Sequence, residues 1–406
     1  MKRLYRYLPP FAGDYSGVGS ALYELGGMLC IHDASGCTGN YVGFDEPRSY
    51  DSRQLVYCTS LRKNDAILGN EEVYIQKIVQ AAAEMKPAFI AIVGSPVPMV
   101  IGFDFDGVAR EIEHRTGLPT FGFDTCGMKG SYKDGVIMAA EKLLARLAPP
   151  YMPVAEHQKS GKSVNILGAT PLDMSEENVQ ALRRLLEAKG YAVNVSFFMG
   201  NTLEDYQRFH YADINLAITQ AGAVTAQYME KHYHIPYLAG LPIGDAGSAH
   251  YFDCLKRVLH TKKSLEVSQI PIPISMGAEA SGKKALILED GIIASSIRTT
   301  LMAEGYSHID VLSLFEKDSG VDGLNMSFAK TENDIIKAVN SEDYNLIIAD
   351  PLILALRKNQ AGVQLIELPK YAISSKLMHQ KRWIYVSDGW DMHLKSLSQD
   401  EKAVNY

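Results

Sequence analysis

Three cysteines in separate loop-like segments are the residues whose type and position most suggest chemistry. Cys37 follows Gly36 shortly after the apolar run 21–31, Cys58 comes 21 positions later, and Cys126 lies in a stretch rich in Gly, Ser and Thr. Loops held by a rigid scaffold often carry binding residues, and thiolates from separate loops can together hold one iron–sulfur cluster. The alternative for each thiol is a small buried apolar side chain, which describes most free cysteines.

The other two cysteines have apolar neighbours. Cys30 lies in the apolar run before Cys37, so we expect it in the core, with a further cluster thiol as the alternative. Cys254 stands at helical spacing among apolar residues and is also expected in the core. Asp104 and Asp106 alternate with phenylalanines, and we expect them to be acids at the N-terminus of a helix, with proton donors as the alternative.

Composition limits the classes of protein to which this chain can belong. Its 406 residues predict two to three domains. No stretch approaches the ~20 apolar residues that a membrane helix needs, and the basic segment 1–10 has no apolar core of signal-peptide length. We therefore expect no membrane association and a cytoplasmic location. The net charge of −7 argues against general affinity for nucleic acid, and five cysteines in a reducing compartment are expected as thiols or metal ligands.

Short apolar strands alternate with amphipathic helices along the chain, which predicts an α/β fold of parallel sheets covered on both faces. Polar or Pro-rich linkers at 149–161 and 270–273 divide the pattern. We therefore expect three Rossmann-like domains, at residues 1–152, 160–268 and 276–406. The expected helices include 71–85, 105–116, 133–147 and 292–304, and the expected strands include 88–93, 118–123, 163–168, 193–198, 214–219, 284–288, 309–314 and 345–350.

Sequence motifs for nucleotide binding and for hydrolysis are missing from the chain. No Gly-x-Gly-x-x-Gly fingerprint occurs, and the segment 160–163, which ends in Gly-Lys-Ser, lacks the earlier glycine and precedes a strand. There is no nucleophile elbow and no His-Glu-x-x-His. We expect neither a bound nucleotide nor hydrolase chemistry.

Several short motifs occur in an order that resembles a known family. They are the segments 32–37 with its terminal Gly-Cys, 65–69, 100–104, 130–132 and 228–237. Together they resemble the nitrogenase component 1 superfamily, which includes the light-independent protochlorophyllide and chlorophyllide reductases and related cofactor scaffolds. The resemblance covers nearly the whole chain, is strongest in the first segment, and implies a nitrogenase component 1-like arrangement of the three units.

The resemblance also implies an iron–sulfur cluster at an interface between two subunits, with three thiolates from each. Cys37 falls on the second of these thiolate positions. The first position falls at residues 11–13. The third falls at residues 95–98, just before the motif 100–102, and neither segment contains a cysteine. The cluster expected is [4Fe–4S], which needs four ligands, so the missing ones must come from other thiols or another chain.

Cys58 and Cys126 lie beside the implied cluster region and are the expected substitute ligands. Gly36 and Ser131 are the further residues expected near the cofactor, and for Ser131 the alternative is a hydroxyl that caps the helix beginning near Tyr132. A molybdenum cofactor is not expected, because the cysteine that it would require maps near Thr219.

The function that the resemblance implies is that of a nitrogenase-like oxidoreductase subunit. It would hold the cluster at a subunit interface and pass electrons from an ATP-dependent iron–sulfur reductase to a bound substrate. The expected partners are that reductase and a second component 1-like subunit or a second copy of this chain, in a dimer or tetramer. The alternative is a non-catalytic scaffold or carrier for a metallocluster or tetrapyrrole, or the structural half of a heterodimer.

Overall fold

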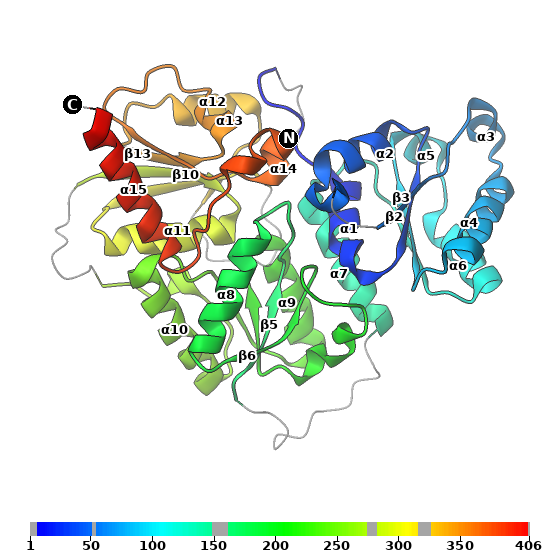
Figure 1. Cartoon of the computed structure of the whole chain (residues 1–406), viewed down its shortest axis with the longest axis horizontal. Helices are drawn as coiled ribbons and strands as arrows, with labels where there is room; N and C mark the ends of the chain where they lie inside the picture. Colours follow the sequence, from blue (N-terminus) through cyan, green and yellow to red (C-terminus); the bar gives the residue numbers. More distant parts are fainter. Residues whose placement is uncertain (1–5, 51–53, 148–160, 274–281, 316–325, 405–406) are drawn as a thin grey trace.

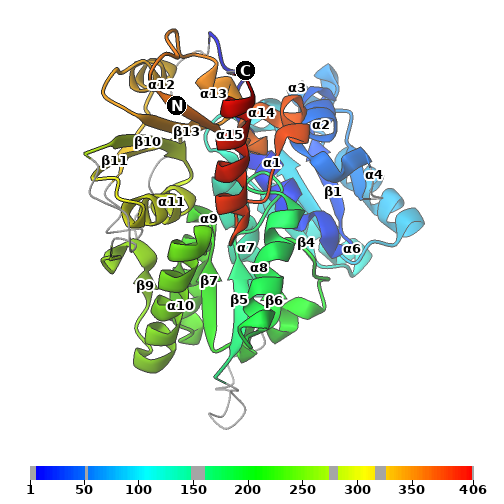
Figure 2. The same cartoon turned by 60° about the vertical axis from the view of Figure 1, so that its left-hand side comes forward.

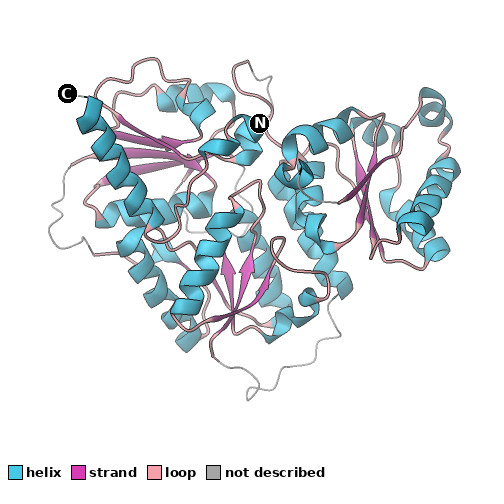
Figure 3. Cartoon of the chain, in the orientation of Figure 1, coloured by secondary structure: helices cyan, strands magenta, loops and turns pink. Residues whose placement is uncertain are grey.

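The computed structural model describes residues 6–50, 54–147, 161–273, 282–315 and 326–404. The chain forms three α/β units, each built on one parallel sheet (Figure 1). Helices cover the faces of all three sheets, as the alternation of apolar strands and amphipathic helices predicts (Figure 3). The N-terminal unit lies to one side, and the other two units lie next to each other.

The N-terminal unit contains a four-stranded sheet of order β2-β1-β3-β4. The two central strands are buried along their whole length, as expected for a parallel sheet with helices on both faces. All neighbouring strands pair in parallel, so their carboxyl ends meet at one edge. The strands are β1 (Met28–His32), β2 (Leu55–Cys58), β3 (Ile90–Gly94) and β4 (Thr120–Phe123).

Helices surround this sheet. The predicted helices 71–85 and 105–116 are α4 and α6. The Asp104 carboxylate accepts a hydrogen bond of 2.8 Å from the Gly107 N–H at the start of α6, which confirms Asp104 as a helix N-terminal acid. The helices are α1 (Asp14–Leu22), α2 (Gly36–Asn40), α3 (Lys63–Leu68), α4 (Glu71–Met85), α5 (Pro96–Ile101), α6 (Phe105–Thr116) and α7 (Tyr132–Leu147).

Helices α1 and α7 pack against each other at very short range. A Cβ atom at Gly17 would lie 1.8 Å from the carbonyl oxygen of Tyr132, and one at Gly135 would lie 1.9 Å from that of Asp14. Only glycine permits two helix backbones to approach so closely at these points. Figure 1 shows this pair, α1 and α7, on the side of the N-terminal unit that faces the rest of the chain.

The middle unit has a five-stranded parallel sheet of order β6-β5-β7-β8-β9. Its strands are β5 (Ser163–Leu167), β6 (Ala192–Ser196), β7 (Ile214–Ala217), β8 (Tyr237–Ala239) and β9 (Leu265–Glu266), and its helices are α8 (Glu176–Ala188), α9 (Gln220–Tyr233) and α10 (Gly244–Thr261). Cys254 lies buried in α10, in agreement with its expected place in the core.

The third unit has a sheet of order β12-β11-β10-β13-β14. Its C-terminal helix returns toward the middle unit (Figure 2) and contacts α10. In the segment before that helix, the Trp383 carbonyl accepts a hydrogen bond of 3.0 Å from the Asn178 side-chain amide of α8. The elements are β10 (Lys284–Glu289), β11 (His308–Ser313), β12 (Ser327–Phe328), β13 (Leu346–Ala349) and β14 (Gln364–Glu367), with α11 (Gly291–Ala303), α12 (Glu332–Val339), α13 (Pro351–Leu354), α14 (Tyr371–Ser374) and α15 (Gly389–Val404).

These three sheets confirm the predicted α/β class and the three Rossmann-like parallel-sheet units. The domain limits themselves stay a prediction. The first predicted boundary, between 152 and 160, lies outside the described residues, and the second, between 268 and 276, lies partly outside them.

Candidate functional site

The carboxyl edge of the N-terminal sheet carries three of the five cysteines. Cys58 is the last residue of β2, Cys37 is the second residue of α2 after β1, and Cys126 follows β4. Ser95, the first residue of the segment 95–98 on which the third implied thiolate position falls, follows β3. The strand order places these residues along one edge in the order Cys58, Cys37, Ser95 and Cys126. We call this the thiol edge.

Cys37 is partly exposed at the start of α2. Its thiol lies near the hydroxyl of Tyr15, which accepts a hydrogen bond of 3.3 Å from the Asn40 side-chain amide. Burial and the nearby carboxylates of Asp33 and Asp45 raise the pKa of the Cys37 thiol, against the opposing effect of Tyr15. The thiol of the isolated chain is therefore held in its protonated form.

Asp33 shapes the loop that presents Cys37. Its carboxylate accepts from the backbone N–H groups of Ser35 (3.0 Å) and Thr38 (3.1 Å), and its backbone carbonyl accepts from the Cys58 thiol at 3.6 Å. Ser35 has φ of 140°, a backbone conformation that side chains rarely adopt. Gly36 follows with open space around it, since a Cβ there would meet no atom within 4 Å.

Cys126 is buried and only 1% exposed, unlike the other two thiols. Its backbone N–H and that of Gly127 both donate to the carboxylate of Asp14, at 3.1 Å and 2.5 Å. Burial raises the pKa of Asp14, although these hydrogen bonds oppose the rise. The loop is thereby fixed against the start of α1, with the thiol turned into the protein.

Ser131 lies just before α7, near this loop. Both its backbone N–H and its hydroxyl donate to the Asp134 carboxylate, at 2.6 Å and 3.0 Å. Its hydroxyl therefore takes part in the hydrogen bonds that begin α7. A role of Ser131 beside a cofactor stays a prediction.

The implied thiolate positions without a cysteine fall on the segments 11–13 and 95–98, and one residue of each makes a close contact. A Cβ atom at Gly13 would lie 2.9 Å from the Cα of Gly127, so the backbone leaves no room for a side chain there. In the segment 95–98, the Ser95 hydroxyl is fully buried and donates to the carbonyl of His32 at 2.8 Å.

The donor groups of this chain do not by themselves fit a four-thiolate cluster. Among the described residues, no group of three or more His, Cys, Asp or Glu side chains is arranged to hold a metal ion. Cys37, Cys58 and Cys126 share an edge without forming one metal-binding group within the chain. Their role as ligands, and that of Gly36 and Ser131 as cofactor contacts, stays a prediction that depends on a second chain.

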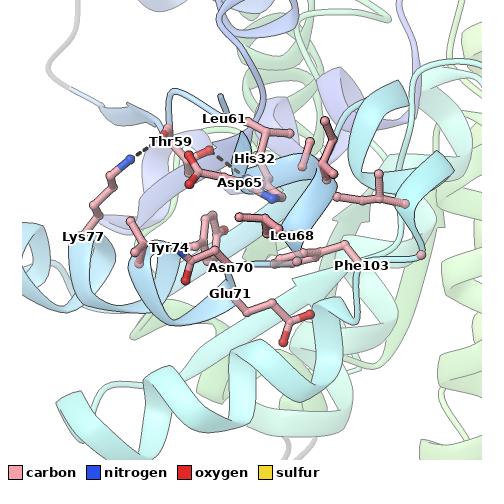
Figure 4. A pocket seen from close by; sticks show the side chains of 16 residues that line it. His32, Thr59, Leu61, Asp65, Leu68, Asn70, Glu71, Tyr74, Lys77 and Phe103 are labelled. Atoms are coloured by element: carbon pink, nitrogen blue, oxygen red, sulfur yellow. Dashed lines mark hydrogen bonds between the residues drawn. The ribbon is translucent and has the colours of Figure 1, made fainter. Parts of the chain in front are cut away.

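A cavity of about 250 Å³ opens beside the thiol edge (Figure 4). His32, the last residue of β1, lies in its wall with the rings of Tyr74 and Phe103, whose centroids are each 4.4 Å from the imidazole centroid. The Nδ1 atom of His32 is 2.8 Å from the Thr59 hydroxyl, and the Lys77 ammonium donates to the Thr59 carbonyl at 3.2 Å. These contacts fix the imidazole ring in the wall of the cavity at the end of β1.

Burial lowers the pKa of His32 to about 4, with the positive charge of Lys77 acting in the same direction and Asp33 opposing it. The imidazole is therefore neutral at physiological pH. A neutral ring with one nitrogen on Thr59 can accept or donate a hydrogen bond, but it adds no charge beside the thiols.

A set of exposed apolar side chains surrounds the thiol edge and the mouth of the cavity. Leu68 at the end of α3 is 78% exposed, and Val100 in α5 is 76% exposed. Exposed apolar side chains in such number on one edge mark an interaction surface more often than an ordinary solvated face. This apolar rim consists of Val42, Ile67, Leu68, Val97, Val100, Ile101 and Met128.

Several residues of this site were not found from sequence. The sequence separations of Tyr15, Asp14 and Asp45 from the cysteines match no known motif. Only the fold brings these residues to the thiol edge. Tyr74 and Phe103 belong to segments that the sequence marks as helix and turn, and nothing in their spacing predicts that both contact His32.

The described helices include none with both the length and the apolar character needed to cross a membrane.

The family described as nitrogenase component 1 type oxidoreductase matches residues 14–348 of the sequence. A subunit of the light-independent protochlorophyllide reductase from Nostoc punctiforme is 24% identical over 293 residues, which cover 66% of this chain and 57% of that protein. The same kind of subunit from Methylobacterium sp. strain 4-46 is 26% identical over 216 residues, with 53% and 42% covered. The chain spans about half the length of the curated relatives it matches.

Solved structures agree with this assignment at the level of the fold. Nitrogenase Cp1 at pH 5 aligns over 97% of this chain and 89% of that chain, with a TM-score of 0.65 and 16% sequence identity. The same protein at pH 6.5 aligns over 91% and 87%, with a TM-score of 0.65 and 15% identity. Both the predicted resemblance and the predicted arrangement of the fold are confirmed. The chain belongs to the nitrogenase component 1 type oxidoreductase family.

Proposed function

We propose that this chain is a subunit of a nitrogenase-like oxidoreductase that uses its thiol edge as the interface with a second chain. The observation that carries the proposal is the position of Cys37, a half-buried thiol at the same sheet edge as the helices and loops that carry the apolar rim. Relatives named as subunits of a light-independent protochlorophyllide reductase support a subunit role. The second chain is a component 1-like subunit or another copy of this one.

The apolar rim favours a protein at this edge over bulk water. Docking there would bury Leu68, Val100 and their neighbours, and it would remove water from around Cys37. An iron–sulfur cluster bound at the interface would supply single-electron transfer, with the electrons coming from an ATP-dependent iron–sulfur reductase. The roles of this chain's own residues follow from their contacts. Tyr15 orients the Cys37 thiol, and Asp33 holds the loop that presents it.

The partner must supply at least two of the four ligands. Cys37 and Cys58 follow neighbouring strands and are both partly exposed, whereas Cys126 is buried. One chain thus offers at most two accessible thiols at this edge, and a cluster needs four ligands. Two copies, or one copy and a subunit with more cysteines, would complete the set.

Iron analysis of anaerobically purified protein tests this proposal. We expect the complex with its partner, or the self-associated chain, to be brown and to contain iron and sulfide. Cys37→Ala should remove the iron, whereas Cys254→Ala, which changes a buried thiol far from the edge, should retain it. Iron-free wild-type protein from cells with intact cluster assembly would contradict the redox role.

A second candidate function is that of a structural half of a heterodimer. It is favoured by the contact of Gly13 with Gly127, which leaves no room for a side chain at one residue of the segment 11–13. A complex that assembles through the apolar rim but contains no iron would support this function over the first.

A further inference from the structure

A buried ionic cluster lies where the three units meet. The ammonium of Lys370, between β14 and α14, is 2.5 Å from the carboxylate of Glu289 and 3.4 Å from that of Asp173. Glu289 is the last residue of β10, and Asp173 lies in the loop after β5. The hydroxyl of Tyr132, the first residue of α7, donates to the same Asp173 carboxylate. The four side chains therefore come from all three units.

The cluster is closed to solvent. The side chains of Lys370 and Asp173 are each 1% exposed, and that of Glu289 is 2% exposed. Charges buried to this extent persist only when they are paired, because their transfer out of water is costly. The rings of Tyr132 and Phe315 flank the ammonium, with centroids 6.0 Å and 5.8 Å away.

Asp290 is a third acid that faces Lys370. Its carboxylate accepts from the backbone N–H of Gln220 at the start of α9, at 3.0 Å, and from that of Ile292 in α11, also at 3.0 Å. Burial raises the pKa of Asp290, and the attraction of Lys370 opposes that rise. The Lys370 ammonium thus lies among three buried carboxyl groups, those of Asp173, Glu289 and Asp290.

The backbone beside Lys370 makes further bridges between the units. The Ala372 N–H donates to the carbonyl of Leu172 in the middle unit at 3.0 Å, and the Ala372 carbonyl accepts from the N–H of Ala12 in the N-terminal unit at 2.9 Å. The segment 370–372 of the third unit therefore contacts both of the others through side chain and main chain.

We propose that Lys370 is an internal latch that fixes the N-terminal unit, with its thiol edge, onto the two C-terminal units and closes the space between them at this point. Separation of the units here would have to break the contacts of the ammonium with its acids, so this junction is a fixed joint. The inference does not depend on the proposed redox function.

Chemical rescue of the full-length chain tests the latch. Lys370→Ala removes three methylene groups and the ammonium, which is the outline of n-propylammonium. We expect amide exchange in α7, followed by mass spectrometry, to become about tenfold faster or more in this variant. Added n-propylammonium should restore slow exchange, whereas n-propanol should not. The matched control is Lys381→Ala, which removes an exposed ion pair with Glu367 and should leave α7 unchanged.

Tyr132→Phe is the second variant, because it removes only the hydroxyl that joins the N-terminal unit to Asp173. We expect faster exchange at the start of α7 with the sheets of all three units still protected. Wild-type exchange in Lys370→Ala, or rescue by n-propanol as well as by n-propylammonium, would overturn the latch. If Lys370→Ala does not fold even with n-propylammonium, Tyr132→Phe decides. An amide exchange rate in α7 equal to that of the wild type would overturn the latch, and a faster rate would support it.

Discussion

Gly13 approaches Gly127 so closely that a Cβ atom on Gly13 would lie 2.9 Å from the Cα atom of Gly127. The two residues join the start of α1 to the loop that contains Cys126, and the Asp14 carboxylate binds the same loop from the next position. A cysteine at Gly13, one residue of the segment 11–13 on which the first implied thiolate position falls, would therefore collide with the backbone. Ser95, in the segment 95–98 on which the third position falls, is different because its side chain already has room and a hydrogen-bond acceptor.

Cysteines introduced at Gly13 and at Ser95 should lower the free energy of unfolding by unequal amounts. Gly13→Cys forces the Gly127 loop to move, and we expect it to lower the free energy of unfolding by roughly 1–3 kcal/mol. Ser95→Cys replaces one small hydrogen-bonding group by another, and we expect a loss of roughly 1 kcal/mol. Urea denaturation of both variants measures the difference, and equal losses would contradict the contact between Gly13 and Gly127.

The reactivity of Cys37 should depend on Tyr15. Burial and the Asp33 carboxylate raise the pKa of this thiol, and the nearby Tyr15 hydroxyl opposes them. We expect Tyr15→Phe to raise that pKa further and to slow alkylation by iodoacetamide several-fold at pH 8, since the thiolate is the nucleophile. Mass spectrometry of the Cys37 peptide gives the rate, with Cys58 in the same sample as the internal reference. An unchanged Cys37 rate would show that Tyr15 does not act on the thiol.

His32 should make the protein less stable in mild acid. Its pKa is lowered from 6.5 to about 4, so the unfolded chain binds a proton between these values and the folded chain does not. The neutral His32 ring contributes to the free energy of unfolding in full above pH 6.5. This contribution is lost as the pH falls toward 4, by about 3 kcal/mol at most. His32→Phe keeps the ring between Tyr74 and Phe103 and removes the titration. We expect a flatter dependence of unfolding free energy on pH in this variant, and a parallel dependence in the two proteins would refute the shift.

The apolar rim should control assembly and leave folding unchanged. Leu68 is 78% exposed in the single chain, so Leu68→Asp should change the free energy of unfolding by less than about 0.5 kcal/mol. In the assembled complex it would place a charge in a desolvated interface, and we expect association to weaken at least tenfold. Analytical ultracentrifugation measures this, with the exposed Met302→Asp on α11 as the control. Equal association of both variants would exclude the rim as the interface.

Local sequence patterns predicted many elements closely. The helices α4 and α6 agree with the predicted bounds 71–85 and 105–116, because each has acids in its first turn and a buried apolar face. The apolar run 21–31 was harder, since it spans the end of α1, two glycines and most of β1. A short buried strand and the end of a buried helix have the same composition, so periodicity alone does not separate them.

The contacts of the site depended on tertiary structure. Cys37, Cys58 and Cys126 were expected together, and the strand order does place them on one edge. Burial of Cys126 was not predictable, because it results from the Asp14 hydrogen bonds across more than a hundred residues. The Lys370 cluster had no sequence signal, since each of its members is an ordinary charged or aromatic residue until the three units meet.

The glycine contact between α1 and α7 has a mechanical consequence. Both helices would have to move together, because Gly17 and Gly135 leave no space in which one could slide past the other. The thiol edge stands at one end of this pair, and Tyr132 ties the pair to Asp173. We therefore expect an event at the edge, such as the arrival of another chain, to reach the contact between Tyr132 and Asp173 through the two helices moving as one body, instead of being absorbed by a local loop adjustment.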